Sequence, residues 1–104
     1  MEEESGEPIL QQVVTTFLHH GDRLLAVVRD DLRTGRLTEV AEAAHSLAGS
    51  AAAIGAFSLS RSCRQLEQHA KALRSADCAT VFESLESDYR AASEALLALV
   101  GERG

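Results

Sequence analysis

Apolar side chains recur along the chain at alternating steps of three and four residues, the period of a helix face packed in a bundle. One such stripe crosses the middle of the chain through Leu37, Val40, Ala44, Leu47, Ala51 and Ile54. A second stripe follows through Leu59, Cys63, Leu66, Ala70 and Leu73. Gly55 stands between them, and glycine supplies the positive φ that commonly ends a helix. The pattern therefore predicts two antiparallel helices that meet at Gly55.

The same pattern predicts further helices before and after this pair. Pro8 can open a short helix, and Gly21 and Asp22 are typical of a helix end followed by an N-cap. We therefore expect a break over residues 19–22, which separates a short N-terminal helix from four longer ones. The expected helices cover residues 8–18, 22–33, 37–54, 57–74 and 78–101.

Long helices joined by short turns favour an all-α fold, here an antiparallel up-down-up-down four-helix bundle with a short additional N-terminal helix. With 104 residues the chain has room for one domain, expected over residues 8–101. The acidic residues 1–7 are expected to form a flexible N-terminus. Cys63 and Cys78 both fall on core stripes, so we expect them to be buried free thiols.

His45 and Glu67 each lie one position off the apolar stripe of their helix, at the edge of the buried seam. Counted outward from Gly55 they stand at nearly equal distances along the two helices, so they should fall at the same height. A carboxylate in that place accepts the N–H of one imidazole nitrogen and fixes the tautomer of the ring. The other ring nitrogen is left as an exposed nucleophile.

The stretch from His45 to Glu67 resembles the signature of histidine-containing phosphotransfer (HPt) domains. In that family His-x-Leu-Lys-Gly-Ser is followed by a run of small residues, Gly-Ala, a leucine and often Cys-x-x-Leu-Glu. The matching residues are His45, Leu47, Gly49, Ser50, Gly55, Ala56, Leu59, Cys63, Leu66 and Glu67. The chain departs from the family at Ala48, where the usual residue is a lysine that helps to hold the phosphoryl group.

The resemblance implies that the chain is a phosphorelay intermediate in two-component signalling. His45 would accept a phosphoryl group from a receiver-domain phospho-aspartate and pass it to, or back to, a receiver aspartate. The expected partner is the receiver domain of a response regulator or of a hybrid sensor histidine kinase. Autonomous kinase activity and a cofactor are not expected, since nothing in the chain resembles a nucleotide-binding loop. Mg²⁺ is expected on the partner receiver domain.

Ser46, Gly49, Ser50 and Arg64 are the further candidates for contacts with the phosphoryl group or the partner. Gly49 either packs closely against a neighbouring helix or leaves clearance for the partner's active site, and we favour clearance. Ser50 could equally hydrogen-bond a phosphoryl oxygen or its own helix.

The lysine that is missing at Ala48 raises the question of a replacement cation. Arg64 lies one turn before Glu67 on the same flank of its helix and is our candidate for that role. Arg61 and Lys71 are weaker candidates for the same role, and we interpret both as solvated helix charges. The remaining basic side chains of interest are histidines, which we interpret as exposed and uninvolved. These are His19, His20 and His69.

The net charge of −6 argues against a nucleic-acid partner, which would require a basic face. Because no apolar run approaches the length that spans a bilayer, we expect no membrane association and a cytoplasmic location. A monomer is expected, since nothing demands self-association.

A metal centre is not expected, because the Glu-x-x-His pattern of dimetal bundles occurs once, at Glu42 and His45. The alternative function, which Ala48 keeps open, is a non-transferring helical interaction module that binds a receiver domain or another signalling protein.

Overall fold

The computed structural model describes residues 6–103 of the chain. Within that range it contains four helices and no strand, so the prediction of an all-helical fold is confirmed. The helices are α1 (Gly6–Thr34), α2 (Leu37–Ala53), α3 (Phe57–Lys71) and α4 (Ser75–Arg103). They form an elongated body of 52 × 18 × 18 Å.

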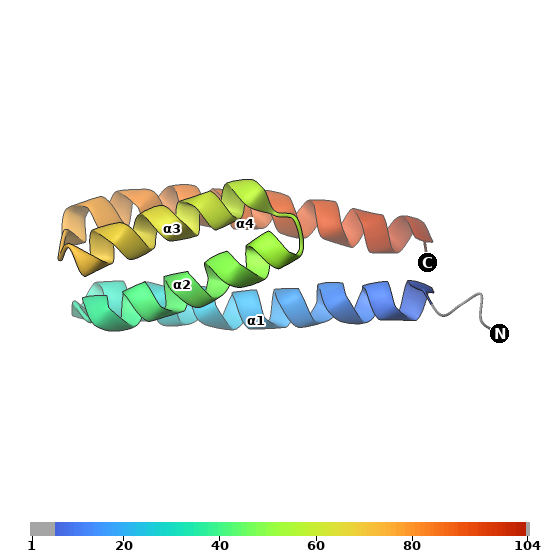
Figure 1. The fold of residues 1–104 in the computed structure, drawn as a ribbon, viewed down its shortest axis with the longest axis horizontal. Coiled ribbons are helices and arrows are strands. Elements are labelled where there is room, and N and C mark those ends of the chain that lie inside the picture. Colours follow the sequence, from blue (N-terminus) through green and yellow to red (C-terminus); the bar gives the residue numbers. More distant parts are fainter. Residues whose placement is uncertain (1–5, 104) are drawn as a thin grey trace.

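Consecutive helices run back and forth along the long axis of the molecule, and α1 and α4 extend beyond the turn that joins α2 to α3 (Figure 1). Side-chain contacts between α1 and α4 show that these two helices are antiparallel. Asp22 contacts Tyr89 and Arg29 contacts Glu86, so residue numbers rise along one helix as they fall along the other. The chain thereby brings its first and last helices together and closes the bundle.

All three connections between helices have the same backbone geometry. Each connection contains one residue with a positive φ: these are Gly35 (77°), Gly55 (85°) and Leu73 (60°). The next N–H then bonds back across five residues, as in the Schellman motif. These bonds run from Arg36 N to Asp31 O (2.8 Å), from Ala56 N to Ala51 O (2.8 Å) and from Arg74 N to His69 O (2.9 Å).

The third turn differs from its prediction. Helix α3 ends at Lys71 and α4 begins at Ser75, so the turn precedes the expected one at residues 75–77. Leu73 was assigned to a core stripe, but it occupies the positive-φ position and is 73% exposed. A left-handed leucine costs about 1 kcal/mol, and a turn without glycine leaves no signal in the sequence.

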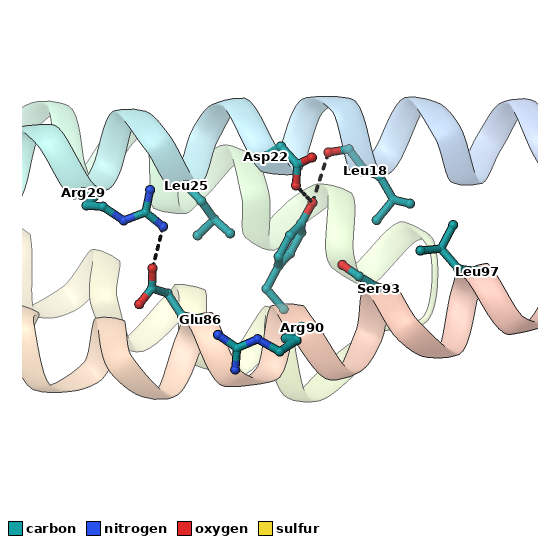
Figure 2. Close-up of a pocket in the computed structure, with 9 residues that line it drawn as sticks. Leu18, Asp22, Leu25, Arg29, Glu86, Arg90, Ser93 and Leu97 are labelled. Carbon is teal, nitrogen blue, oxygen red and sulfur yellow. Dashed lines mark hydrogen bonds and ion pairs between the residues drawn. The ribbon is translucent and has the colours of Figure 1, made fainter.

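The predicted break at residues 19–22 is wrong, and there is no separate short helix before the bundle in the described residues. Helix α1 is continuous from Gly6 to Thr34. Gly21 does not end a helix; it makes room for the aromatic ring of Tyr89, since a Cβ added at Gly21 would lie 2.5 Å from Tyr89 Cε1. The Tyr89 hydroxyl donates to Asp22 Oδ1 at 2.7 Å and lies 3.0 Å from the Leu18 carbonyl oxygen (Figure 2). This contact between distant segments outweighs the cost of glycine in a helix.

The prediction of a flexible segment over residues 1–7 falls mostly outside the described residues, which begin at Gly6. Helix α1 already includes Gly6, two residues before Pro8. Pro8 therefore lies in the first helical turn, where its missing N–H removes no bond within the helix.

The core is formed by the apolar stripes of the four helices. Both cysteines belong to it as free, fully buried thiols, as predicted. Burial raises the pKa of the Cys63 thiol to about 12, so this side chain stays protonated at neutral pH. The largest fully buried side chains are Val14, Val40, Leu47, Leu59, Cys63, Leu66, Cys78 and Leu85.

Two helix glycines give opposite expectations for stability. Gly21→Ala should lower the free energy of unfolding by about 1–3 kcal/mol, because the new methyl group displaces the hydrogen-bonded Tyr89 ring. Gly49→Ala is the matched control, since a Cβ there meets no atom within 4 Å. It should raise stability by up to about 1 kcal/mol through helix propensity alone. Urea denaturation of both variants measures the difference, and equal stabilities would contradict the close-packing role of Gly21.

Candidate functional site

His45 on α2 and Glu67 on α3 face each other across the helix hairpin, at the same height as the sequence predicted. His45 Nδ1 lies 3.1 Å from Glu67 Oε2 and 3.3 Å from Oε1. The His45 side chain is 75% exposed, whereas that of Glu67 is only 13% exposed. Because an ionised carboxylate can only accept, Nδ1 must donate the hydrogen bond. The lone pair of the ring therefore sits on Nε2.

Small side chains bring the two helices close enough for this contact. Five of the buried residues of α2 are alanines, and they lie on both sides of His45. The Ser60 hydroxyl of α3 donates to the carbonyl oxygen of Ala48 at 3.0 Å, in a buried position. A serine side chain can reach a backbone carbonyl of the neighbouring helix only where the two helices approach closely. Glu67 can consequently reach the imidazole from the adjacent helix.

Glu67 is shared between two partners. Lys71, one turn further along α3, places its Nζ 3.0 Å from the same Oε2 that accepts from His45. Burial of the Glu67 carboxyl would raise its pKa, but the hydrogen bonds from Lys71 and His45 outweigh burial and hold the pKa below its ordinary value. Glu67 is therefore ionised at neutral pH and remains an acceptor for the Nδ1–H of His45.

Ser46 and Gly49 lie on the exposed side of α2 beside His45. Ser46 Oγ is 3.3 Å from Nε2 of His20 on α1. A Cβ built at Gly49 meets no atom within 4 Å, so the close-packing explanation for this glycine is wrong. The surface one turn after His45 is open on the solvent side.

Ser50 is half-buried in a groove between α1 and α2, with a volume of about 480 Å³. His20 lines the same groove, although it was predicted to be exposed and uninvolved. The wrongly predicted break had placed His20 outside a helix; in the continuous α1 it lies one turn after the buried Phe17 and so flanks the core stripe. The groove is lined by Gln12, Val13, Thr16, Phe17, His20, Ser50, Ala53 and Ile54.

A second groove, of about 560 Å³, runs between α2 and α3 and contains the histidine itself. Arg64 does not line it, and among the described residues Arg64 forms no hydrogen bond or ion pair with His45 or Glu67. Its predicted role stays a prediction. The lining residues are Thr38, Ala41, Glu42, His45, Glu67, Ala70, Lys71 and Leu73.

A third groove, of about 520 Å³, lies between α1 and α4 (Figure 2). It contains the ion pair of Arg29 and Glu86, whose atoms are 2.6 Å apart, and the contacts of Tyr89 with α1. None of the predicted site residues lines it, and its polar groups join the first and last helices.

The described residues contain neither a metal-binding cluster nor a membrane-spanning helix. Residues 6–103 contain no group of three or more histidine, cysteine, aspartate or glutamate side chains placed to hold a metal ion. In the same range, every helix is too short or too polar to cross a membrane.

The fold and the site together define a helical module that presents an exposed imidazole oriented by a carboxylate. The family model of the Hpt domain matches residues 12–98, so the chain belongs to the Hpt domain family. Hpt domains are phosphocarrier modules of two-component signalling that act through a histidine, interact with receiver domains and have no catalytic activity of their own. The curated proteins and solved structures that were compared with the chain gave no match.

Replacing Glu67 with alanine should release the imidazole. Without the acceptor at Nδ1, the ring can carry its proton on Nε2 instead. The exposed Nε2 then has no lone pair with which to attack phosphorus. We expect a larger fraction of the Nε2–H tautomer in ¹⁵N NMR spectra, and a roughly tenfold slower phosphorylation of His45 by the small donor phosphoramidate. Glu39→Ala, an exposed acid at the start of α2, is the control. An unchanged tautomer would contradict the orienting role of Glu67.

Proposed function

We propose that His45 accepts a phosphoryl group from the phospho-aspartate of a receiver domain and passes it to, or back to, a receiver aspartate. The observation that carries this proposal is the pairing of an exposed ring with a fixed tautomer. Nδ1 donates its hydrogen bond to Glu67. The His45 side chain is 75% exposed, so a partner can approach the ring from solvent. On this proposal the antiparallel bundle serves to hold one imidazole in place.

The transfer step requires no proton movement at the histidine. The Nε2 lone pair forms the N–P bond while the P–O bond to the receiver aspartate breaks, and its electron pair leaves with the carboxylate. The Nδ1–H stays on the ring, hydrogen-bonded to Glu67, whose negative charge balances the positive charge that the phosphorylated imidazole acquires. The reverse step restores both partners. We expect the receiver to supply the Mg²⁺ that offsets charge on the phosphoryl oxygens.

We propose that the receiver docks over Gly49 and the groove between α1 and α2. Gly49 leaves the approach to His45 open, and the groove offers apolar contact area beside it. Val13, which is 49% exposed, belongs to the lining of this groove. Ser46 and Ser50 lie on the same side and are the candidate polar contacts.

The alternative of a non-transferring interaction module rests on Ala48. Its methyl side chain is uncharged and buried. The position at which the family has a lysine therefore offers no positive charge to a phosphoryl group. The module would bind a receiver or another signalling protein while His45 stays unmodified. A monomeric state, a cytoplasmic location, and the absence of a nucleic-acid partner, of a cofactor and of autonomous kinase activity also remain parts of our proposal.

The first test is phosphoryl transfer from a phosphorylated receiver domain, with Mg²⁺, to this chain and to His45→Gln. We expect label on the native chain alone, because glutamine offers no nucleophilic nitrogen. The label should be lost in acid and retained in alkali, as an N–P bond requires. A folded native chain that binds a receiver but takes up no label would favour the interaction module.

A second test separates docking from chemistry at Gly49. Gly49→Gln should slow transfer from a receiver about tenfold or more, equivalent to about 1.4 kcal/mol, because the side chain obstructs the approach to His45. Labelling by phosphoramidate, which needs no docked protein, should not change. Ala91→Gln adds the same bulk to an exposed position of α4 and should leave both rates as they are. Slower labelling by both donors in Gly49→Gln would show that the glycine acts on His45 itself.

A further inference from the structure

The groove beside His45 has an unusual charge balance for a site that must hold a phosphoryl group. Its lining includes two carboxylates, Glu42 and Glu67, and one amine, Lys71. The whole chain is acidic, with a net charge of −6. A phosphoryl group adds one and a half to two further negative charges at neutral pH. Some positive charge near His45 is therefore needed to offset this repulsion, and Ala48 does not provide it.

Lys71 is the only lysine of the chain, and it is already placed at the site. Its Nζ and the Nδ1 of His45 both contact the same oxygen of Glu67, at 3.0 Å and 3.1 Å. The ammonium group thus lies within two hydrogen-bond lengths of the imidazole. Among the described residues that line this groove, no other lysine or arginine is present.

The direction of the helices explains why Lys71, rather than Arg64, reaches the histidine. A side chain on an α-helix leans toward the N-terminus of its own helix. Contacts of His45 with Glu67 and of Ala48 with Ser60 show that α2 and α3 run in opposite directions. His45 therefore leans toward the level of Lys71, and Lys71 leans back toward the level of Glu67. Arg64, one turn before Glu67, leans away from the imidazole.

The existing ion pair does not hold Lys71 firmly. Its side chain is 67% exposed, and an exposed lysine–carboxylate pair contributes little to stability. The long flexible stem lets the ammonium leave Glu67 for a phosphoryl oxygen without a change of backbone. A doubly charged phosphoryl group is the stronger acceptor for that ammonium.

We infer that Lys71 contacts the phosphoryl group carried by His45, and that it replaces from α3 the lysine that the family carries on α2 at the position of Ala48. This inference rests on the proposed phosphoacceptor function of His45. In the transfer step Lys71 breaks no bond and donates only hydrogen bonds to phosphoryl oxygens, while Nε2 forms the N–P bond and the aspartate carboxylate leaves. It is the positive charge, rather than the lysine shape, that the site requires.

The test measures the rate of transfer from a phosphorylated receiver to the full chain and to four variants, which are Lys71→Ala, Lys71→Arg, Arg64→Ala and His45→Gln. Lys71→Ala should transfer about three to ten times more slowly, a range set by the solvent screening of an exposed charge. Lys71→Arg should restore most of the rate. Arg64→Ala tests the competing candidate, and on this inference its loss of rate is smaller than that of Lys71→Ala.

The tautomer of His45 distinguishes a contact with phosphate from an indirect effect through Glu67. In ¹⁵N NMR spectra, Lys71→Ala should keep the Nδ1–H tautomer, because Glu67 remains in place as acceptor. A changed tautomer, or a slow Lys71→Arg variant, would overturn the inference, since Lys71 would then act only by positioning Glu67. A native rate in Lys71→Ala together with a slow Arg64→Ala would assign the role to Arg64.

Because the chain has one lysine, its amine can also be observed directly. Reductive methylation with ¹³C-formaldehyde labels one side chain and keeps its positive charge. Phosphorylation by phosphoramidate should shift the Lys71 methyl resonance in the native chain and leave it unmoved in His45→Gln. If His45 is phosphorylated and the Lys71 methyl resonance does not move, the role of Lys71 is overturned, whereas the proposed function of His45 stands. A native chain that takes up no label on His45 from either donor would overturn the proposed function and, with it, the role of Lys71.

Discussion

The close approach of α2 and α3 is the constraint on which the site depends. Alanines on both sides of His45 and the hydrogen bond from Ser60 to the Ala48 carbonyl keep the two helices near each other. Only at this separation can both oxygens of Glu67 come within 3.3 Å of Nδ1. The tautomer of the histidine, and with it the nucleophilic nitrogen, follows from helix packing. A larger residue in place of one of these alanines would separate the helices and leave the ring free to rotate.

The two residues of the site differ in their exposure to solvent. Glu67 is nearly buried, which holds its carboxylate in one place, whereas His45 extends into solvent where a partner can reach it. Its lowered pKa keeps Glu67 charged, and the charge is useful in both states of the histidine. In the proposed function it accepts the Nδ1–H before transfer, and it faces a positively charged ring after transfer. Lys71 pairs with Glu67 in the structure, and on our inference it pairs with phosphate once His45 is phosphorylated.

Two glycines inside helices illustrate how differently one residue type can be used. Gly21 faces inward, and the Tyr89 ring of α4 fills the space that a side chain would need. Gly49 faces outward, and no atom of residues 6–103 occupies the space beside it. Both give up helix propensity of about 1 kcal/mol. At Gly21 the packing of α1 on α4 offsets this cost. At Gly49 no contact with another described residue does so, which is consistent with a surface kept open for a partner.

The sequence by itself determined the helical class, two of the turns and the pairing of His45 with Glu67. These follow from apolar periodicity, from positive-φ glycines and from counting residues outward from Gly55 along one hairpin. Only the tertiary structure decided that α1 is continuous, because the partner of Gly21 is the distant Tyr89. It also placed His20 beside Ser46, set the turn at Leu73 and brought Lys71, rather than Arg64, against Glu67. Period and turn chemistry are local properties of a few residues, whereas the face a helix turns to its neighbour depends on side chains far along the chain.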